Sequence, residues 1–206
     1  MRKLRILIAD DHSLVRIGLK SMLGFQPDME VVGEAPDGKR AIELATELKP
    51  DVVVMDLMMP GMNGADATKG VMEASPGTRV IVLTSFGSAS DLARAVDNGA
   101  SGAQSKEEST DRLLDAIRIV AAGGTAFSPE LRQTIEDEAA QPPLTAKQTE
   151  ILQSVVLGFS NKEIAAQFGI SPESVKKHMS AILGKLGASS RAEAVGIALR
   201  RQLFKV

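Results

Sequence analysis

Four short apolar runs in this chain each end next to a residue that can do chemistry. The acid pair Asp10 and Asp11 follows the first run, Asp56 the second and Thr84 the third, and Lys106 comes shortly after a weaker fourth run. Runs this short and rich in β-branched residues are typical of strands buried on both faces of a sheet. Ligands bind at the carboxyl ends of the strands in an open parallel sheet, so these side chains are expected to share one pocket, suited to a divalent cation and a phosphoryl group.

Strand and helix patterns alternate five times before residue 123. Such alternation predicts an α/β domain in which helices cover both faces of a parallel sheet, and right-handed crossovers favour a doubly wound, five-stranded arrangement. The expected strands are Leu4–Ala9, Met29–Gly33, Val52–Met55, Arg79–Leu83 and Ser101–Ala103, and the expected helices are Ser13–Leu23, Lys39–Leu48, Ala65–Ala74, Ser90–Asn98 and Ser109–Ala122.

The composition limits the class of protein. A chain of 206 residues with 44% apolar residues is large enough for one large domain or two small ones with packed cores. It has no cysteine, which excludes disulfides and thiolate metal sites and agrees with a reducing compartment. No stretch approaches the roughly 20 apolar residues that a membrane helix needs, and no signal-peptide core follows the first residues. We expect a cytoplasmic protein with no membrane partner.

Charge divides the chain into two modules. Residues 1–141 carry 15 Lys and Arg against 22 Asp and Glu, whereas residues 142–206 carry 9 against 4. The small basic module is therefore the candidate for binding a polyanion. Between the modules, two glycines precede an acidic stretch that ends in two prolines, a composition typical of a linker. The expected organisation is a first domain over residues 1–124, a linker over 125–143 and a second domain over 144–206.

The second module reads as four helices. Thr145 with Gln148 three residues later fits a capping box that opens the first helix, which runs to Leu157. Ser171 followed by Pro172 is a favourable start for the third helix. The second and third helices, joined by a turn that contains glycine, form a helix-turn-helix pattern in a small all-α domain. The second helix is expected over Asn161–Phe168 and the fourth over Arg191–Leu203. The third is expected to continue to about Leu186.

The first module resembles the receiver domain of bacterial two-component response regulators over about residues 4–122. The resemblance rests on Asp10-Asp11, on the segment from Val54 to Gly64, on Leu83-Thr84-Ser85, and on Gly99-Ala100-Ser101-Gly102 leading to Lys106. It implies a flavodoxin-like strand order of 2-1-3-4-5. It also implies Mg²⁺ as the cofactor, a hard ion bound through few carboxylates plus phosphate oxygens. The implied ligands are Asp11 and Asp56 directly, Asp10 through water, and the backbone carbonyl of Met58.

The resemblance also assigns the chemistry. Asp56 is the expected phosphoacceptor, whose carboxylate attacks the phosphohistidine of a partner sensor histidine kinase. Lys106 is expected to pair with the phosphoryl oxygens, and the hydroxyl of Thr84 to donate to one of them as the switch. No further enzymatic activity is expected beyond this self-phosphorylation and slow self-dephosphorylation. The slow rate is expected because Met58 and Phe86 are apolar at positions where relatives can carry side chains that orient water.

One departure concerns signalling. Three residues before the lysine, the family usually has an aromatic residue whose rotation reports phosphorylation, and this chain has Ala103. Signalling is then expected to pass through Thr84 and the fourth helix, with looser coupling between phosphorylation and DNA affinity. The fifth strand is expected to be a weak edge strand, because Gly102, Gln104 and Ser105 offer little to bury.

The second module resembles the LuxR-type output domain of the NarL/FixJ class over about residues 144–200. The residues that carry the resemblance are Leu144-Thr145, Gly158, Ser160 to Ala165, Ile170-Ser171, Val175 to His178, Lys185-Leu186 and Arg191-Ala192. Contacts with double-stranded DNA are expected at Asn161, Lys162, Lys176, Lys177, His178 and Ser180. A homodimer on DNA is expected to form through the last helix, at Val195, Ile197, Ala198 and Leu199.

Together the two resemblances imply a transcriptional response regulator. Phosphorylation of Asp56 is expected to release the output domain so that it dimerises on DNA. One alternative is a regulator that binds DNA without phosphorylation and uses its receiver for docking or dimerisation, which Ala103 keeps open. A second is a phosphatase with an aspartate nucleophile, but such enzymes typically carry another Asp two residues on, where this chain has Met58.

Overall fold

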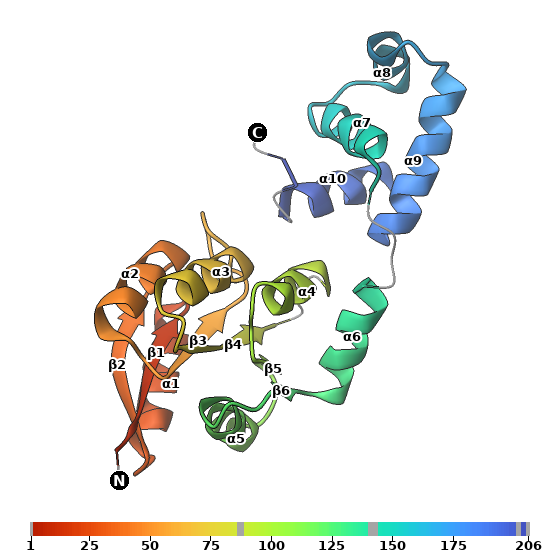
Figure 1. The fold of residues 1–206 in the computed structure, drawn as a ribbon. Coiled ribbons are helices and arrows are strands. Elements are labelled where there is room, and N and C mark those ends of the chain that lie inside the picture. Colours follow the sequence, from red (N-terminus) through yellow and green to blue (C-terminus); the bar gives the residue numbers. More distant parts are fainter. Residues whose placement is uncertain (1, 86–88, 140–143, 201–202, 205–206) are drawn as a thin grey trace. The chain divides into compact units, whose positions relative to one another are not determined.

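The computed structural model of the chain describes residues 2–85, 89–139, 144–200 and 203–204. It divides into two compact units, Met1–Glu138 and Ala139–Val206. Strands and helices alternate in the first unit, and the second is helical in its described residues (Figure 1). The elements of the first unit are β1 (Leu4–Ala9), α1 (Ser13–Gly24), β2 (Met29–Ala35), α2 (Gly38–Leu48), β3 (Val52–Asp56), α3 (Gly64–Ala74), β4 (Arg79–Thr84), α4 (Ala89–Asp97), β5 (Gly102–Ser105), α5 (Thr110–Ala121), β6 (Ala126–Phe127) and α6 (Pro129–Ala139).

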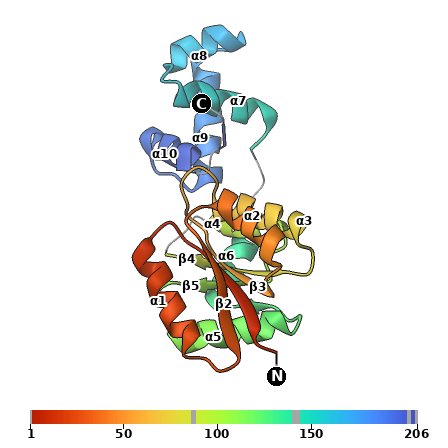
Figure 2. The ribbon, with the colours of Figure 1, turned by 90° about the vertical axis from the view of Figure 1, so that its left-hand side faces the viewer.

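The first unit is a parallel sheet between two layers of helices. Its strand order is β2-β1-β3-β4-β5-β6, so the expected 2-1-3-4-5 order is confirmed for the first five strands. Alternate residues of each central strand face opposite layers. Val53 and Met55 of β3 pack in the core under α2, α3 and α4, whereas Val52 and Val54 pack against α1 and α5. Figure 2 shows α2 and α3 on one side of the sheet and α1 and α5 on the other.

The sheet has six strands, not the five expected. The added strand β6 pairs in parallel with β5, so β5 is internal and the expectation of an edge strand is wrong. Gly102 permits this pairing, since a Cβ atom there would lie 2.7 Å from the backbone oxygen of Ala126. The small residues of β5 predicted a weak strand. One of them, Gly102, instead allows β6 to pair closely with β5. The remaining expected elements of this unit are confirmed, with ends shifted by at most two residues.

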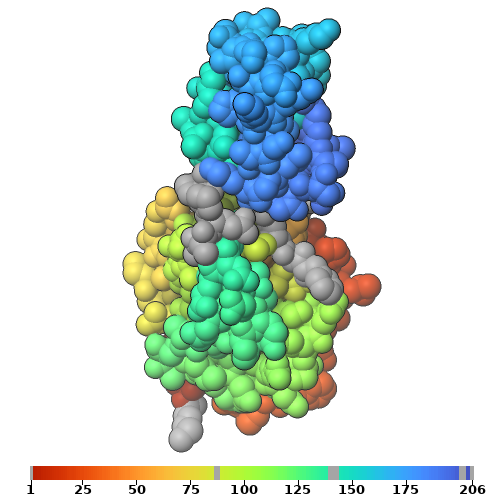
Figure 3. All heavy atoms as spheres, turned by 90° about the vertical axis from the view of Figure 1, so that its right-hand side faces the viewer, coloured from red at the N-terminus to blue at the C-terminus, as the bar shows by residue number. Residues whose placement is uncertain are grey.

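The expected linker over residues 125–143 is wrong for most of its length. Residues 126–127 form β6 and residues 129–139 form α6. Phe127, Leu131 and Ile135 are partly buried against the core under α4, and they recur every four residues, which places them on one face of a helix and its lead-in. Figure 3 shows α6 face-on as the blue-green segment lying over the first unit. Residues 140–143 lie outside the described part.

The second unit contains α7 (Ala146–Val156), α8 (Asn161–Phe168), α9 (Pro172–Leu186) and α10 (Arg191–Arg200). Its core is a separate apolar cluster to which all four helices contribute. The predicted capping box of Thr145 and Gln148 is confirmed, and Ser171 caps α9 as expected. The fourth helix is described as far as Arg200, and Leu203 is not helical, so the expected end at Leu203 is wrong. Across the described ranges, no helix combines the length and apolarity required to cross a membrane.

Candidate functional site

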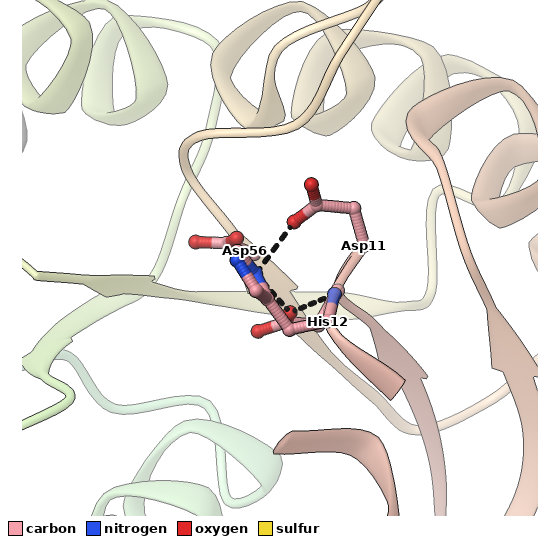
Figure 4. A group of neighbouring side chains, drawn as sticks. Asp11, His12 and Asp56 are labelled. Carbon is pink, nitrogen blue, oxygen red and sulfur yellow. Dashed lines mark hydrogen bonds and ion pairs between the residues drawn. The ribbon is translucent and has the colours of Figure 1, made fainter. Parts of the chain in front are cut away.

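The predicted acidic residues meet at the carboxyl end of the sheet. Asp10 and Asp11 follow β1, and Asp56 is the last residue of β3, the strand beside it. Asp10 is 1% exposed and Asp56 2% exposed. One ligand atom from each of Asp10, Asp11, His12 and Asp56 lies within 4.8 Å of the others, and Figure 4 shows the labelled three converging. His12 was not expected here, since a histidine after an acid pair carries no spacing signal of its own.

Lys106 completes this cluster from the loop after β5. Its Nζ lies 2.7 Å from Oδ2 of Asp10 and 3.0 Å from Oδ1 of Asp56. The backbone holds the lysine in place, because its N–H donates to the carbonyl oxygen of Thr84 at 2.8 Å. Thr84 ends β4 and is 5% exposed. The five residues expected to share a pocket thus come from the ends of β1, β3 and β4 and from the loop after β5.

Burial and charge oppose one another within the cluster. Burial of the carboxyl raises the pKa of Asp56, and the nearby Lys106 ammonium offsets only part of that rise. For Lys106, burial acts to lower the pKa, but the hydrogen bond to Asp10 and the charge of Asp56 outweigh burial, so the pKa of the ammonium is raised. The ammonium pairs with two of the three carboxyl groups in the cluster, which leaves the site with excess negative charge when all three are ionised.

The backbone around Asp56 is tightly constrained. The N–H of Leu57 donates to the carbonyl oxygen of Leu83, and the N–H of Gly64 donates to the carbonyl oxygen of Leu57, both at 2.9 Å. A Cβ atom at Gly64 would lie 2.1 Å from the backbone oxygen of Asp56. Only glycine therefore allows the start of α3 to approach the backbone of Asp56 this closely. Met58, with 43% of its surface exposed, donates its N–H to Oδ1 of Asp56 at 3.3 Å.

The donor set suits a hard divalent cation. Oxygen ligands predominate, and a cation would neutralise the excess negative charge of the site. Oδ1 of Asp11 is buried and accepts no hydrogen bond from the described residues. A buried carboxylate oxygen in that state costs free energy unless an ion or water satisfies it. The cluster is therefore an acidic pocket that fits a metal ion.

A second candidate site lies on α8 and α9 of the other unit. Lys162, Lys176, Lys177 and Ser180 are exposed, as required for contact with a partner, and His178 is half-buried. Beside them is a surface depression of about 280 Å³. Its lining residues are Asn161, Lys176, Met179, Ser180, Leu183 and Arg191.

Arg191 is a residue of this surface that the sequence did not assign. Its Nη1 donates to Oδ1 of Asn161 at 2.9 Å, and its Nη2 donates to the carbonyl oxygen of Phe159. This bond uses only the amide oxygen of Asn161, whereas a contact with a phosphate oxygen requires the amide nitrogen as donor. The guanidinium also adds a cation to the depression.

The expected dimer residues on α10 divide into two groups. Ala198 is 1% exposed and belongs to the core of the unit, so its assignment to a surface contact is wrong. It lies one helical turn after Ala194, which is also buried, and the two small side chains let α10 pack closely on the core. Leu199 is 51% exposed, whereas Val195 and Ile197 are half-buried against the core.

Comparison with protein families identifies both units. A model of the response regulator receiver domain matches residues 6–118, and a model of the bacterial regulatory proteins of the luxR family matches residues 142–198. The chain belongs to the two-component response regulators with a receiver domain and a LuxR-type helix-turn-helix DNA-binding domain. The predicted family and fold class are confirmed, apart from the number of strands.

Individual relatives span the whole chain. Response regulator protein VraR of Staphylococcus aureus is 39% identical over 207 residues, which covers 98% of this chain and 99% of the relative. The crystal structure of response regulator ChrA, from a heme-sensing two-component system, is 34% identical with a TM-score of 0.60 and covers 99% of this chain and 100% of ChrA. RcsB from Salmonella enterica serovar Typhimurium, solved bound to promoter DNA with a phosphomimetic, shares the fold with a TM-score of 0.82 at 24% identity, over 97% of this chain and 100% of that one.

Proposed function

We propose that this chain regulates transcription and that phosphorylation of Asp56 by a sensor histidine kinase controls its binding to DNA. The observation that carries the proposal is the buried Asp56 carboxylate, held between the acid pair and the Lys106 ammonium. In the proposed step, an Oδ atom of Asp56 bonds to the phosphorus of a phosphohistidine as the bond between phosphorus and the kinase imidazole breaks. The product is an acyl phosphate on Asp56 and a free imidazole.

Each neighbour of Asp56 has a proposed role in that step. Asp11 and Asp56 would hold Mg²⁺ directly, with Asp10 through water and the Met58 carbonyl; the ion supplies neutralisation of charge on the transferring group. Lys106 exchanges a carboxylate partner for a phosphoryl oxygen, which its flexible stem allows. The Thr84 hydroxyl donates to another phosphoryl oxygen, which makes it the switch.

We also propose that the acyl phosphate is lost slowly. Met58 is exposed beside Asp56 and has no group that could orient an attacking water. Phe86, the other apolar residue in this argument, lies outside the described part of the chain. The rate of phosphate loss tests the idea, since Met58→Asn should lose phosphate faster than the wild type.

The exposed cations of α8 and α9 are the proposed contacts with double-stranded DNA. Lys162, Lys176 and Lys177 would pair with phosphates and position the domain without reading sequence. Asn161, His178 and Ser180 lie on the same two helices and would contact DNA beside them. Dimerisation would use the exposed side chain of Leu199 with its half-buried neighbours Val195 and Ile197, and two copies would then bind two half-sites.

The decisive experiment compares wild type with Asp56→Asn, each with and without acetyl phosphate and Mg²⁺. Oligomeric state is measured by sedimentation, and affinity is measured for a duplex selected from a random pool with phosphorylated wild type. We expect wild type alone to dimerise and gain affinity on treatment. Equal binding by both proteins under every condition would overturn phosphorylation control and favour the alternative in which the receiver serves only for docking or dimerisation.

A further inference from the structure

His12 brings an imidazole nitrogen into the carboxylate cluster at the end of β1. Its Nδ1 lies 2.8 Å from Oδ1 of Asp11 and 3.3 Å from Oδ1 of Asp10. Figure 4 shows the ring beside Asp56, with a dashed line joining it to the Asp11 carboxylate. The side chain is otherwise 66% exposed and makes no capping hydrogen bond to α1, so helix capping does not account for this orientation.

The contact between His12 and Asp11 is short yet is not a hydrogen bond. Oδ1 of Asp11 accepts no hydrogen bond from the described residues although Nδ1 is 2.8 Å away, so an N–H on that nitrogen would not point at the oxygen. Two ligand atoms at right angles around one ion, each about 2.1 Å from it, lie about 3 Å apart. The distance between Nδ1 of His12 and Oδ1 of Asp11, and the poor direction for a hydrogen bond between them, are typical of two adjacent ligands of one ion.

The other groups nearby leave these two atoms available. Asp10 already accepts from the backbone N–H of His12 at Oδ1 and from Lys106 at Oδ2. Asp56 accepts from Lys106 and from the N–H of Met58 at Oδ1. Oδ1 of Asp11 and Nδ1 of His12 are thus an adjacent pair through which an ion could be held without displacing Lys106.

We propose that His12 is a ligand of this metal site through Nδ1, and that it gives the site a preference for transition-metal ions over Mg²⁺. Imidazole suits ions such as Ni²⁺, Zn²⁺ and Fe²⁺, whereas Mg²⁺ prefers oxygen ligands and water. The proposal deepens the proposed function and rests on it, because it concerns the same metal site. Mg²⁺ still binds through the carboxylates, but His12 adds affinity only for the softer ions.

The test is calorimetric titration of the full chain with Mg²⁺ and, separately, with Ni²⁺. We compare wild type with His12→Ala and with His178→Ala, a matched control because the chain has only two histidines. His12→Ala is expected to weaken Ni²⁺ binding by about tenfold or more, a loss on the scale seen when a metal ligand loses even an outer-shell partner. Its Mg²⁺ affinity should stay unchanged, and His178→Ala should match wild type with both ions.

A spectroscopic readout and a carboxylate variant separate the possible failures. In the electron spin echo of bound Cu²⁺, an ion that suits imidazole, the nitrogen modulation of an imidazole ligand should appear in wild type and vanish in His12→Ala. An unchanged ratio of Ni²⁺ to Mg²⁺ affinity in His12→Ala overturns the role of His12 and leaves the proposed function intact. If Asp11→Asn still binds both ions like wild type, the carboxylate site fails as well, and the metal part of the proposed function fails with it.

Discussion

Lys106 is the residue on which the charge balance of the acidic cluster around Asp56 depends. It is the cation within 3.0 Å of both Asp10 and Asp56, and its side chain is only 17% exposed. Lys106→Met would leave buried carboxylates facing one another. Removing one partner of a buried ion pair costs about 3 kcal/mol or more, because the remaining charge is uncompensated. We expect that loss in the free energy of unfolding, measured by urea denaturation in Mg²⁺-free buffer.

Two further measurements make the Lys106 prediction specific. Lys20→Met is the control, since Lys20 forms an ion pair with Glu34 at a site where the lysine is 59% exposed, and a surface pair contributes little. Added Mg²⁺ should restore part of the stability of Lys106→Met, because an ion that binds only the folded state stabilises it. Equal stability of the two variants without Mg²⁺ would show that the carboxylates do not repel one another as inferred.

At the same scale, the sequence predicted which residues meet but not every neighbour they meet. Asp10, Asp56 and Lys106 were predictable because each follows a strand pattern, and parallel strands bring their carboxyl ends to one edge. The bond between Arg191 and Asn161 was not, since it joins residues 30 positions apart on different helices. The burial of Ala198 was not predictable either, because a small apolar residue suits both a core and an interface.

At the scale of elements, β6 and α6 show where local patterns stop being informative. A strand of two residues is too short to display alternation, and its stability depends on the distant partner β5. The acidic residues and following prolines favoured a linker, although Phe127, Leu131 and Ile135 are spaced as an apolar helix stripe. The longer elements were predictable because buried apolar residues recur at the helix or strand period several times along each one.

Phe127 is expected to hold β6 and α6 onto the first unit. It lies in register with Ala103 of β5, where the family usually has an aromatic residue, and packs against the core under α4. Phe127→Ala should lower the free energy of unfolding by about 2 kcal/mol, since part of one large apolar side chain is lost from the core. Hydrogen exchange should also rise selectively in residues 129–138.

The control for Phe127 is the same substitution at an exposed position. Phe25 is 82% exposed after α1, so Phe25→Ala should leave both stability and exchange in α6 near the wild-type values. Unchanged exchange in α6 of Phe127→Ala would mean that other contacts, such as those of Leu131 and Ile135, suffice to dock the helix.

For the whole molecule, charge and structure divide the chain in the same way. The structural boundary falls between Glu138 and Ala139, and the residues after it carry a net charge of +5 while those before it carry −7. A polyanion is therefore attracted to the second unit and repelled by the first. Composition predicted two modules of opposite charge, since charge depends on which residues are present, but not the boundary, because β6 and α6 extend the first unit.

This division leads to a prediction about salt. If the cations of α9 contact DNA phosphates, each contact releases about one counterion, and affinity falls as salt rises. Lys176→Ala should weaken binding to all duplexes alike and reduce the slope of log affinity against log salt by about 1. Lys69→Ala, at an exposed position on α3 of the acidic unit, should leave the slope unchanged. A slope unaltered by Lys176→Ala, measured by fluorescence anisotropy of a labelled duplex, would remove Lys176 from the DNA interface.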